Sequence, residues 1–475
     1  MEWRSVRRGT SSEDSSDGPG RRRQVAALAV AAVVLALLAA AGVLAWRRWG
    51  GERPRLNAVV VLVDTLRADR LGVYGNRRPT SPHLDALAAR GVVLRRTWSQ
   101  AGCTFPSVNA LLTSRAPARF LGQPQRRMGI PDAVPSLPRA LQAAGYSTAA
   151  VSASPVVRVT PHQVNRHGGF GGGFQSFADD CWQQPGRCVN DAALRVLPRL
   201  REPFLLYLHY MEPHAPYRPP AEHRRRFKRR RGAKPFILRG DPMPLLDMLY
   251  RGGPRLALTE DDRTELRNSY DEEVRYVDQL FGELMAELET RGLLDRSVVV
   301  LAADHGEELL EHGGLGHCRK LAHESVLATP MVWWAPGLAP AVRDGLASNV
   351  DLVPTMLDLL GLPSLPGAEG RSLRPLLAEG RAVNRYAFAT QSTVQAVTDG
   401  RWKLLRDAEG GAPRLFDLVG DPGEGADVAA AHPDVVRRLG ETLAGWVRRT
   451  TGGDERGAAR DALEAERQLR AVGYL

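Results

Sequence analysis

The sequence predicts an α/β fold: a doubly wound, mainly parallel sheet with a small C-terminal α+β subdomain, preceded by one N-terminal transmembrane helix. Residues 58–63 and 298–303 are valine-rich runs with the uninterrupted apolar character of strands buried on both faces of a sheet. Between residues 56 and 383, such runs alternate with segments of helical periodicity. A chain of 475 residues, 43% hydrophobic and 25% charged, is long enough to bury this core.

The N-terminal region is expected to anchor the chain in a membrane. Residues 24–46 carry no charge and, at about 1.5 Å per residue, are long enough to cross a hydrocarbon core of about 30 Å. More arginines precede this segment than follow it, so the positive-inside rule places residues 1–23, a disordered tail, in the cytoplasm. The chain is thus predicted to be a single-pass membrane protein whose catalytic domain is extracytoplasmic, on the periplasmic or cell-surface side. A cleaved signal peptide is the alternative, but the segment is longer than a typical signal-peptide core.

The remaining elements are predicted in order along two domains. In the catalytic domain, residues 56–383, proline near helix starts and glycine after helix ends set several boundaries. Its strands are expected at residues 59–63, 148–153, 203–210, 298–303 and 331–334, and its helices at 82–91, 137–144 and 263–291. The subdomain, residues 384–450, is expected to hold an antiparallel meander (386–397, 402–405 and 414–418) and a helix at 433–448. Residues 451–475 are charged and are expected to be peripheral.

Two of the predicted strands end in carboxylates. Asp64 follows the first strand, and Asp304 and His305 follow the strand at 298–303. The carboxyl ends of parallel strands meet at the edge where open α/β sheets build their sites. Oxygen and imidazole ligands can together hold a divalent cation. An aspartate at one strand end is more often a helix cap or turn residue, so the metal-site prediction rests on the pair.

Seven motifs occur in the order typical of one family. They span residues 63–75, 80–91, 104–114, 209–217, 304–317, 350–361 and 415–424. On these motifs the chain resembles the sulfatase family of the alkaline phosphatase superfamily, over residues 57 to about 447. The resemblance implies an alkaline-phosphatase-like sheet and a metal-dependent hydrolase of sulfate or phosphate-type esters.

The nucleophile position departs from the family pattern. Sulfatases that use formylglycine carry Cys or Ser two residues before a proline and Arg two residues after it. Here Pro106 has Thr104 and Val108 at those positions, and Cys103 lies one place too early. Formylglycine is therefore not expected, since oxidation of a threonine side chain would give a ketone. Threonine at this position resembles the phospho-transferring branches of the superfamily, which attack with a threonine alkoxide.

The resemblance also implies a ligand set for one divalent metal ion. Its members are Asp64, Asp304, His305 and Thr104, with Thr104 as the nucleophile of a covalent intermediate. Thr65 replaces a second family aspartate, so the site has one anionic ligand fewer. Among Mn²⁺, Zn²⁺, Ca²⁺ and Mg²⁺, the imidazole ligand favours Mn²⁺ or Zn²⁺ over Ca²⁺.

Further residues are assigned to the substrate by resemblance. His214 is expected to approach the anionic oxygens or the leaving group. His317 is expected to act as a general acid or an oxygen ligand, because imidazole titrates near neutral pH. Arg319 or Lys320 would add positive charge, and Asn109 would replace part of the missing arginine.

Three other polar residues receive structural interpretations. His209 lies on a predicted buried strand and is interpreted as a satisfied core histidine. Glu307 and Glu308 are expected to begin a helix after Gly306, where carboxylates suit the helix dipole.

The four cysteines are too few for a disulfide scaffold. Cys181 and Cys188 are separated by a Pro-Gly turn, so they are expected to pair in an oxidising compartment. Cys103 and Cys318 could pair or Cys318 could bind the metal, but two free, partly buried thiols are the favoured interpretation.

The partners are predicted from charge. The net charge is +11, and residues 224–234 form a basic run. This run is either a solvated loop or an electrostatic funnel toward an anionic ester, with a glycan or lipid head group as candidates. Nucleic acid is not expected, because no recognised binding module accompanies the charge. The alternatives to a hydrolase are a phosphoryl transferase to an envelope glycan or lipid, and a catalytically silent binding protein of the same fold.

Overall fold

The computed structural model describes residues 32–39, 55–121, 129–182, 186–227, 229–230, 232–320 and 322–454, with single positions between 457 and 467. The chain divides into two units, residues 1–55 and 56–475. In the first unit, residues 32–39 form an exposed helix. No helix within the described ranges has both the length and the apolar character needed to span a membrane. The rest of the predicted anchor at 24–46 and the predicted tail at 1–23 lie outside the described residues.

The second unit is built on an eight-stranded mixed sheet of order β10-β2-β9-β6-β1-β5-β3-β4. Its strands are β1 (Asn57–Val63), β2 (Val92–Trp98), β3 (Ser147–Ser152), β4 (Ser176–Ala178), β5 (Phe204–Tyr210), β6 (Ser297–Ala303), β9 (Ala328–Trp334) and β10 (Ala341–Ser348). Strand β1 pairs in parallel with β5 and β6, whereas β9 is antiparallel to both of its neighbours. The predicted α/β fold with a mainly parallel sheet is confirmed, although β2, β4 and β10 were not predicted.

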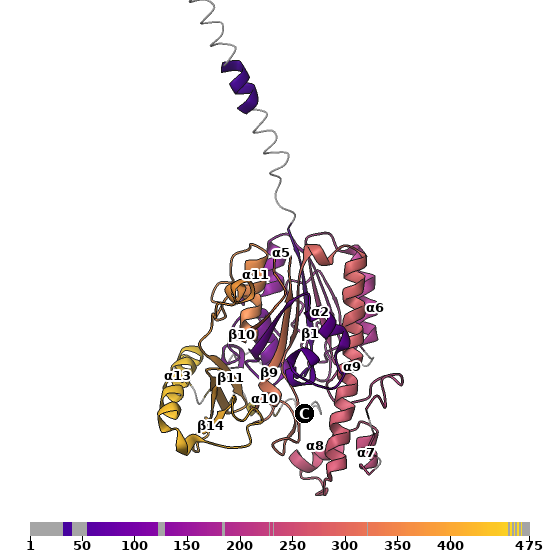
Figure 1. Cartoon of the computed structure of the whole chain (residues 1–475), viewed down its shortest axis with the longest axis vertical. Helices are drawn as coiled ribbons and strands as arrows, with labels where there is room; N and C mark the ends of the chain where they lie inside the picture. Colours follow the sequence, from indigo (N-terminus) through magenta and orange to yellow (C-terminus); the bar gives the residue numbers. More distant parts are fainter. Residues whose placement is uncertain are drawn as a thin grey trace, which may run out of the picture. The chain divides into compact units, whose positions relative to one another are not determined.

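Helices cover both faces of the sheet, which explains why β1 is apolar at every position after Asn57 (Figure 1). Alternate residues of a strand point to opposite faces. Val59, Val61 and Val63 pack in one core, and Ala58, Val60 and Leu62 pack in the other. The first core holds side chains of α2 (Pro82–Ala88), α6 (Arg187–Val196) and α9 (Glu260–Thr290). The second holds side chains of α3 (Thr104–Thr113), α5 (Leu137–Ala143), α11 (Leu352–Leu359) and α12 (Arg374–Glu379).

A second, four-stranded antiparallel sheet follows in the chain. It consists of β11 (Ala387–Gln391), β12 (Val394–Thr398), β13 (Trp402–Asp407) and β14 (Arg414–Asp417), in that order. The segment predicted as one strand at 386–397 is a hairpin, because the chain turns between Gln391 and Val394. Helix α13 (Pro433–Thr451) packs on one face through Leu439, Leu443 and Val447. The other face packs against Trp98 and Leu327 of the main domain.

Short elements complete the described chain. They are α4 (Ala118–Leu121), α7 (Pro235–Leu238), α8 (Met243–Tyr250), α10 (Glu324–Leu327) and the paired strands β7 (Glu308–Leu309) and β8 (Leu315–Gly316). The prediction of a helix that begins at Glu307 and Glu308 is wrong, because this segment folds back as the β7–β8 hairpin.

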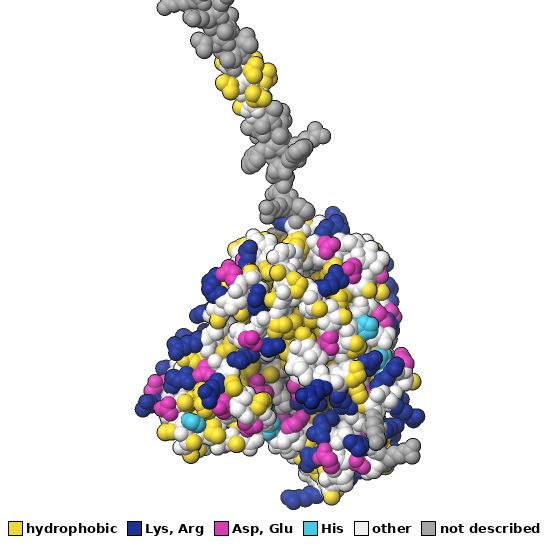
Figure 2. All heavy atoms as spheres, viewed as in Figure 1, with side chains coloured by type: hydrophobic (Ala, Val, Ile, Leu, Met, Phe, Trp, Pro, Cys, Tyr) yellow, Lys and Arg dark blue, Asp and Glu magenta, His cyan; other side chains and the backbone are white. Residues whose placement is uncertain are grey.

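Lysine and arginine side chains are interspersed with carboxylates over the face seen in Figure 2.

Both cysteine pairs form disulfides. Cys181 and Cys188 are joined, as expected. Cys103 and Cys318 are also joined, so the interpretation of these two as free thiols is wrong. Their Cα atoms lie 4.5 Å apart although 215 residues separate them in sequence. The Cys318 amide donates to the Gly102 carbonyl at 2.6 Å, a contact that only the tertiary fold creates.

Candidate active site

Adjacent strand ends bring the predicted metal ligands together. In the β1–β6 register Val63 lies opposite Ala303, so the next residues, Asp64 and Asp304, leave the sheet side by side. The Nε2 atom of His305 lies 3.9 Å from Asp64 Oδ1 and 3.3 Å from Asp304 Oδ2. All three side chains are fully buried.

Thr104 joins this cluster from the first turn of α3. Its Oγ1 lies 3.5 Å from Asp64 Oδ2 and 3.3 Å from His305 Nε2. The helix is held to the end of β6 by the Ser107 hydroxyl, which donates to the Asp304 carbonyl at 2.6 Å. A hydroxyl is thereby fixed beside two carboxylates and an imidazole, which we name the four-residue cluster: Asp64, Thr104, Asp304 and His305.

The backbone between the cluster residues is also shaped for the site. Thr65 has a φ of 56°, a left-handed conformation that β-branched residues rarely adopt. In this conformation its amide donates to Asp304 Oδ1 at 3.2 Å. The Tyr270 hydroxyl of α9 donates to the Thr65 carbonyl at 2.6 Å. Strained backbone of this kind persists where surrounding contacts hold it, as here.

The buried charges of the cluster fit a divalent cation. Burial alone would raise the pKa of Asp64, but the contact with His209 and the neighbouring imidazoles hold it below its usual range. Burial and the Asp64 charge raise the pKa of Asp304 to about 6. Within the described part of the chain, Asp64 Oδ1 and Asp304 Oδ2 have no hydrogen-bond partner. Two buried carboxylates with unused oxygens that face one imidazole form a donor set for a divalent metal.

His209 belongs to this site, although its sequence position indicated a core histidine. It lies opposite Leu62 in the β1–β5 register, and its Nε2 is 3.3 Å from Asp64 Oδ2. Its ligand nitrogen and oxygens of Asp64 and Asp304 all lie within 4.8 Å of one another. Two sequence signals could have found it: His209 lies near the end of a buried strand, and it is the first residue of the family motif at 209–217.

A second layer of titratable groups lies next to the cluster. The His317 ring centroid is 4.5 Å from that of His305 and 4.8 Å from that of His214. His317 Nδ1 lies 3.4 Å from Glu307 Oε1. Burial lowers the pKa of both His214 and His317, and it raises the pKa of Glu307 to about 7. Glu307 therefore lies beside the site, although the sequence had indicated only that it begins a helix.

His214, Glu307 and His317 line a cavity of about 740 Å³. The cavity has an apolar wall and a charged rim. The apolar side chains include Trp182, Met211, Met243 and Leu246, and the cations are Arg218, Arg224 and Arg319. The guanidinium of Arg319 lies 3.6 Å from the centroid of the Tyr250 ring, a cation–π distance. This space can accept an anionic ester together with a bulky leaving group.

Two predicted substrate residues lie elsewhere. Lys320 Nζ lies 2.8 Å from Asp407 Oδ2 and 2.5 Å from Glu409 Oε2, so its ammonium is directed to the second sheet. Asn109 donates its amide to the Phe105 carbonyl at 2.8 Å within α3. The structure therefore does not bring Lys320 or Asn109 to the four-residue cluster, whereas it places Arg319 on the cavity.

The basic run is largely engaged with α9. Arg229 Nε lies 3.0 Å from Glu265, and Lys234 Nζ lies 2.7 Å from Asp262. These carboxylates belong to the acidic N-terminal part of α9, so part of the charge is compensated within the fold. Within the described part of this run, Arg224 lines the cavity.

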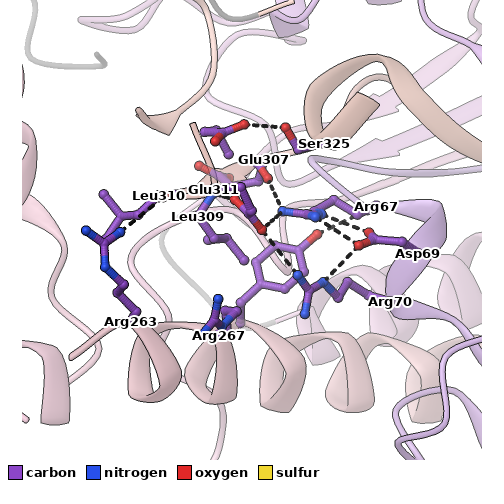
Figure 3. Close-up of polar contacts among 12 residues, drawn as sticks. Arg67, Asp69, Arg70, Arg263, Arg267, Glu307, Leu309, Leu310, Glu311 and Ser325 are labelled. Carbon is purple, nitrogen blue, oxygen red and sulfur yellow. Dashed lines mark hydrogen bonds and ion pairs between the residues drawn. The ribbon is translucent and has the colours of Figure 1, made fainter. Parts of the chain in front are cut away.

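A buried arginine holds the loop that carries the site residues (Figure 3). Arg67 is 4% exposed and donates through Nη1 to the Glu307 carbonyl and to Glu311 Oε1, both at 2.8 Å. Its remaining nitrogens bond the Asp69 carboxylate at 2.8 and 2.9 Å. Arg67 thereby ties the chain after β1 to the chain after β6, which keeps the two halves of the site in register.

The Cys103–Cys318 disulfide also joins the two halves of the site. Cys103 is the residue before Thr104 and caps α3, and Cys318 is the residue after His317. The covalent bond therefore fixes the spacing between the cluster hydroxyl and the imidazole layer.

Comparisons with known proteins agree with this geometry. The sulfatase family model matches residues 56–362. Human arylsulfatase A is 27% identical over 448 residues, which cover 81% of this chain and 86% of that protein. Phosphonate monoester hydrolase SpPMH from Silicibacter pomeroyi has the same fold, with a TM-score of 0.68 at 21% identity over 83% of this chain and 96% of that chain. A structure solved in complex with its substrate D-glucosamine-2-N,6-O-disulfate has a TM-score of 0.68 at 18% identity, over 84% of this chain and 99% of that chain.

Proposed function

Because this chain belongs to the sulfatase family of ester hydrolases, we propose that it is a metal-dependent hydrolase of sulfate or phosphate-type esters with Thr104 as its nucleophile. The observation that carries the proposal is the position of Thr104 Oγ1, 3.5 Å from Asp64 Oδ2 and 3.3 Å from His305 Nε2. A threonine hydroxyl is a weak nucleophile unless its surroundings favour the alkoxide.

The donor set for a divalent metal consists of Asp64, Asp304, His305 and Thr104, with His209 as an additional nitrogen beside it. A bound divalent cation supplies positive charge that lowers the pKa of the Thr104 hydroxyl and offsets charge on the transferring oxygens. We expect Mn²⁺ or Zn²⁺, because the set includes imidazole.

The chain's own residues then carry the ester through two displacements. Thr104 Oγ1 forms a bond to phosphorus or sulfur, and the bond to the leaving oxygen breaks with its electron pair. The hydroxyl proton ends on the leaving alcohol, with His214 and His317 as the groups beside the cavity that transfer it. Water next attacks the Thr104 ester, the bond to Oγ1 breaks, and the threonine hydroxyl is restored.

Cys103 supports a threonine nucleophile over formylglycine. Formylglycine formation needs a free thiol, and the Cys103 sulfur is bonded to Cys318. Thr104 also directs its oxygen into the metal donor set, whereas Cys103 is the extended N-cap residue of α3. Formylglycine-independent sulfate hydrolysis remains within the proposal, because the attacking atom does not depend on the ester.

For the substrate we propose an anionic ester on a glycan or a lipid head group. The cavity is lined by Arg218, Arg224 and Arg319 together with the carboxylates Glu212, Asp241, Glu273 and Glu307. The arginines support an anionic substrate, and the apolar wall favours a bulky leaving group. A relative of this fold acts on a disulfated glucosamine, which supports the glycan option.

We further propose that residues 24–46 anchor the enzyme in a membrane with residues 56–475 outside the cytoplasm. The support is the charge-free sequence of that segment and the two disulfides, which suit an oxidising compartment. Protease protection of residues 56–475 in closed spheroplasts would contradict this orientation, and digestion from outside is the expected result.

The test of the reaction is turnover by the purified full-length chain with Mn²⁺ or Zn²⁺. Matched aryl esters of sulfate, phosphate monoester, phosphate diester and phosphonate would be compared. We expect Thr104→Ala to lower kcat by more than about 10³-fold, whereas Thr104→Ser, which keeps the hydroxyl, retains part of the activity. The double variant C103A/C318A controls for cysteine chemistry, because it removes the thiol without creating a partner-less one.

The outcomes separate the candidates. Full activity of Thr104→Ala would refute a threonine nucleophile. Transfer of the acid group to an added alcohol in preference to water would identify the transferase alternative. Metal binding without turnover of any ester would favour a catalytically silent binding protein. The observation that favours this alternative is Val108, which stands in place of the family arginine.

A further inference from the structure

A second group of potential metal ligands lies outside the four-residue cluster. Glu308, the first residue of β7, His312 of the β7–β8 turn and His323, which precedes α10, bring one ligand atom each within 4.8 Å of one another. Glu308 is fully buried and His323 is 6% exposed, so water does not satisfy these groups freely. One carboxylate and two imidazoles are a common ligand set for zinc.

The hydrogen bonds of His312 leave its Nδ1 atom in a position to bind a metal. His312 Nε2 lies 2.9 Å from the Gly423 carbonyl, and a carbonyl only accepts, so Nε2 carries the hydrogen. The other nitrogen, Nδ1, lies 3.1 Å from Glu308 Oε1. Metal-ligating histidines almost always donate their second ring N–H to a carbonyl or carboxylate in this way. His305 in the four-residue cluster shows the same arrangement, with Nδ1 at 2.9 Å from the Gly306 carbonyl.

His323 supplies the independent indication. Its Nδ1 is buried and has no hydrogen-bond partner within the described part of the chain. The ring stacks on His312 with centroids 3.6 Å apart and planes at 15°. A buried ring nitrogen without a partner is costly, because it has lost its hydrogen bond to water. A shared ion would satisfy this nitrogen and tilt the His323 ring out of the stack.

The charges around the pair favour a cation as well. Lys403 is fully buried and contacts Glu324 at 3.0 Å and Glu424 at 2.8 Å. One ammonium therefore faces two carboxylates, and Glu308 is a third carboxylate in the same region. With His312 protonated beside Glu308, the two cations face three carboxylates, which leaves one negative charge uncompensated in a buried environment. A divalent ion in place of the His312 proton would balance it.

We propose that Glu308, His312 and His323 bind a second divalent metal ion, of the zinc type, which braces the loop of the active site. The ion would replace the proton on His312 Nδ1 and leave Nε2–H on the Gly423 carbonyl. Glu308 follows Glu307 directly, and Gly423 lies beyond β14. The ion would thus join the loop of residues 304–317 to the segment before α10, and the His312 hydrogen bond to Gly423 links that loop to the segment after the second sheet. The inference does not depend on the proposed reaction, because none of its ligands belongs to the four-residue cluster.

The experiment isolates this site in the full-length chain. The double variant D64N/D304N removes two carboxylate ligands of the four-residue cluster and serves as the background. After loading with Zn²⁺ and removal of excess ion, elemental analysis should find one zinc per chain in this background. Co²⁺ should give the absorption of a tetrahedral nitrogen and oxygen site, and binding should release protons, because His312 loses one.

Adding His323→Gln to the background should remove the zinc and the cobalt absorption. The matched control is His167→Gln, the same substitution at an exposed histidine, which should keep both. Absence of zinc and of a cobalt spectrum in D64N/D304N would overturn the proposal, as would unchanged binding after His323→Gln. If the His323 variant fails to fold, His312→Gln in the same background replaces it: loss of the cobalt spectrum supports the site, and an unchanged spectrum refutes it.

Discussion

Removal of the Cys103–Cys318 disulfide tests how the active site is held together. The double variant C103A/C318A opens a loop closed over 215 residues of sequence, whereas C181A/C188A opens one of 7 residues. The chain-entropy relation for cross-links gives about 5.4 kcal/mol for the long loop and about 2.4 kcal/mol for the short one at 25 °C. The predicted difference is therefore about 3 kcal/mol, and it arises in the unfolded state.

The assay is urea unfolding of the metal-free full-length chain, followed by tryptophan fluorescence, for the wild type and both double variants. Thiol titration of the unfolded wild type without reductant should find no free cysteine. The long-loop variant should lose part of its activity on the best ester, because Cys103 precedes Thr104 and Cys318 follows His317, but it should keep far more activity than Thr104→Ala, because the Thr104 hydroxyl is retained. An equal or smaller loss of stability for C103A/C318A than for C181A/C188A would refute the reasoning, and so would two free thiols in the wild type.

Three further perturbations follow from the described contacts. Arg67→Ala should lower kcat by more than tenfold in steady-state assays, because the Glu307 carbonyl loses its buried donor; an unchanged kcat would exclude a positioning role. Lys403→Met should lower the free energy of unfolding by about 3–5 kcal/mol in urea, since two carboxylates lose their buried ammonium; a loss below about 1 kcal/mol would contradict the pairing. Burial lowers the pKa of His323 to about 4, so in metal-free protein the unfolded state binds more protons between that value and its ordinary pKa of 6.5. The free energy of unfolding should therefore fall by about 3 kcal/mol as the pH drops from 6.5 toward 4. In urea titrations of His323→Gln, the free energy of unfolding should fall by that much less over the same pH range. Equal pH dependence of the two proteins would show that His323 does not titrate in this way.

The groups that face His323 enter that comparison, because they titrate or carry charge near it. They are Glu308, His312, Lys403 and Glu424. Gln at position 323 leaves all of them in place, so the difference between the two proteins reports the imidazole alone.

The sequence by itself determined the class of fold and half of the site. The valine-rich runs before Asp64 and Asp304 could only be strands buried on both faces, and their final carboxylates marked the edge of the sheet where ligands bind. Thr104 was assigned by resemblance, because it occupies the position that the sulfatase family pattern gives to the nucleophile, two residues before Pro106. The strand-end signals depend on neighbours in the chain, and the structure brings the four side chains that they and the resemblance indicated close together.

The tertiary structure alone decided the rest. His209 became a neighbour of Asp64 through the β1–β5 register, and a histidine on a buried strand carries no sign of which strand lies beside it. Cys103 met Cys318 across 215 residues for the same reason. The choice between Arg319 and Lys320 was open in the sequence, because chain position does not fix the direction of a long side chain; the Lys320 ammonium contacts Asp407. Contacts between distant segments depend on strand order, register and side-chain direction, and these are set by the packing of the whole domain.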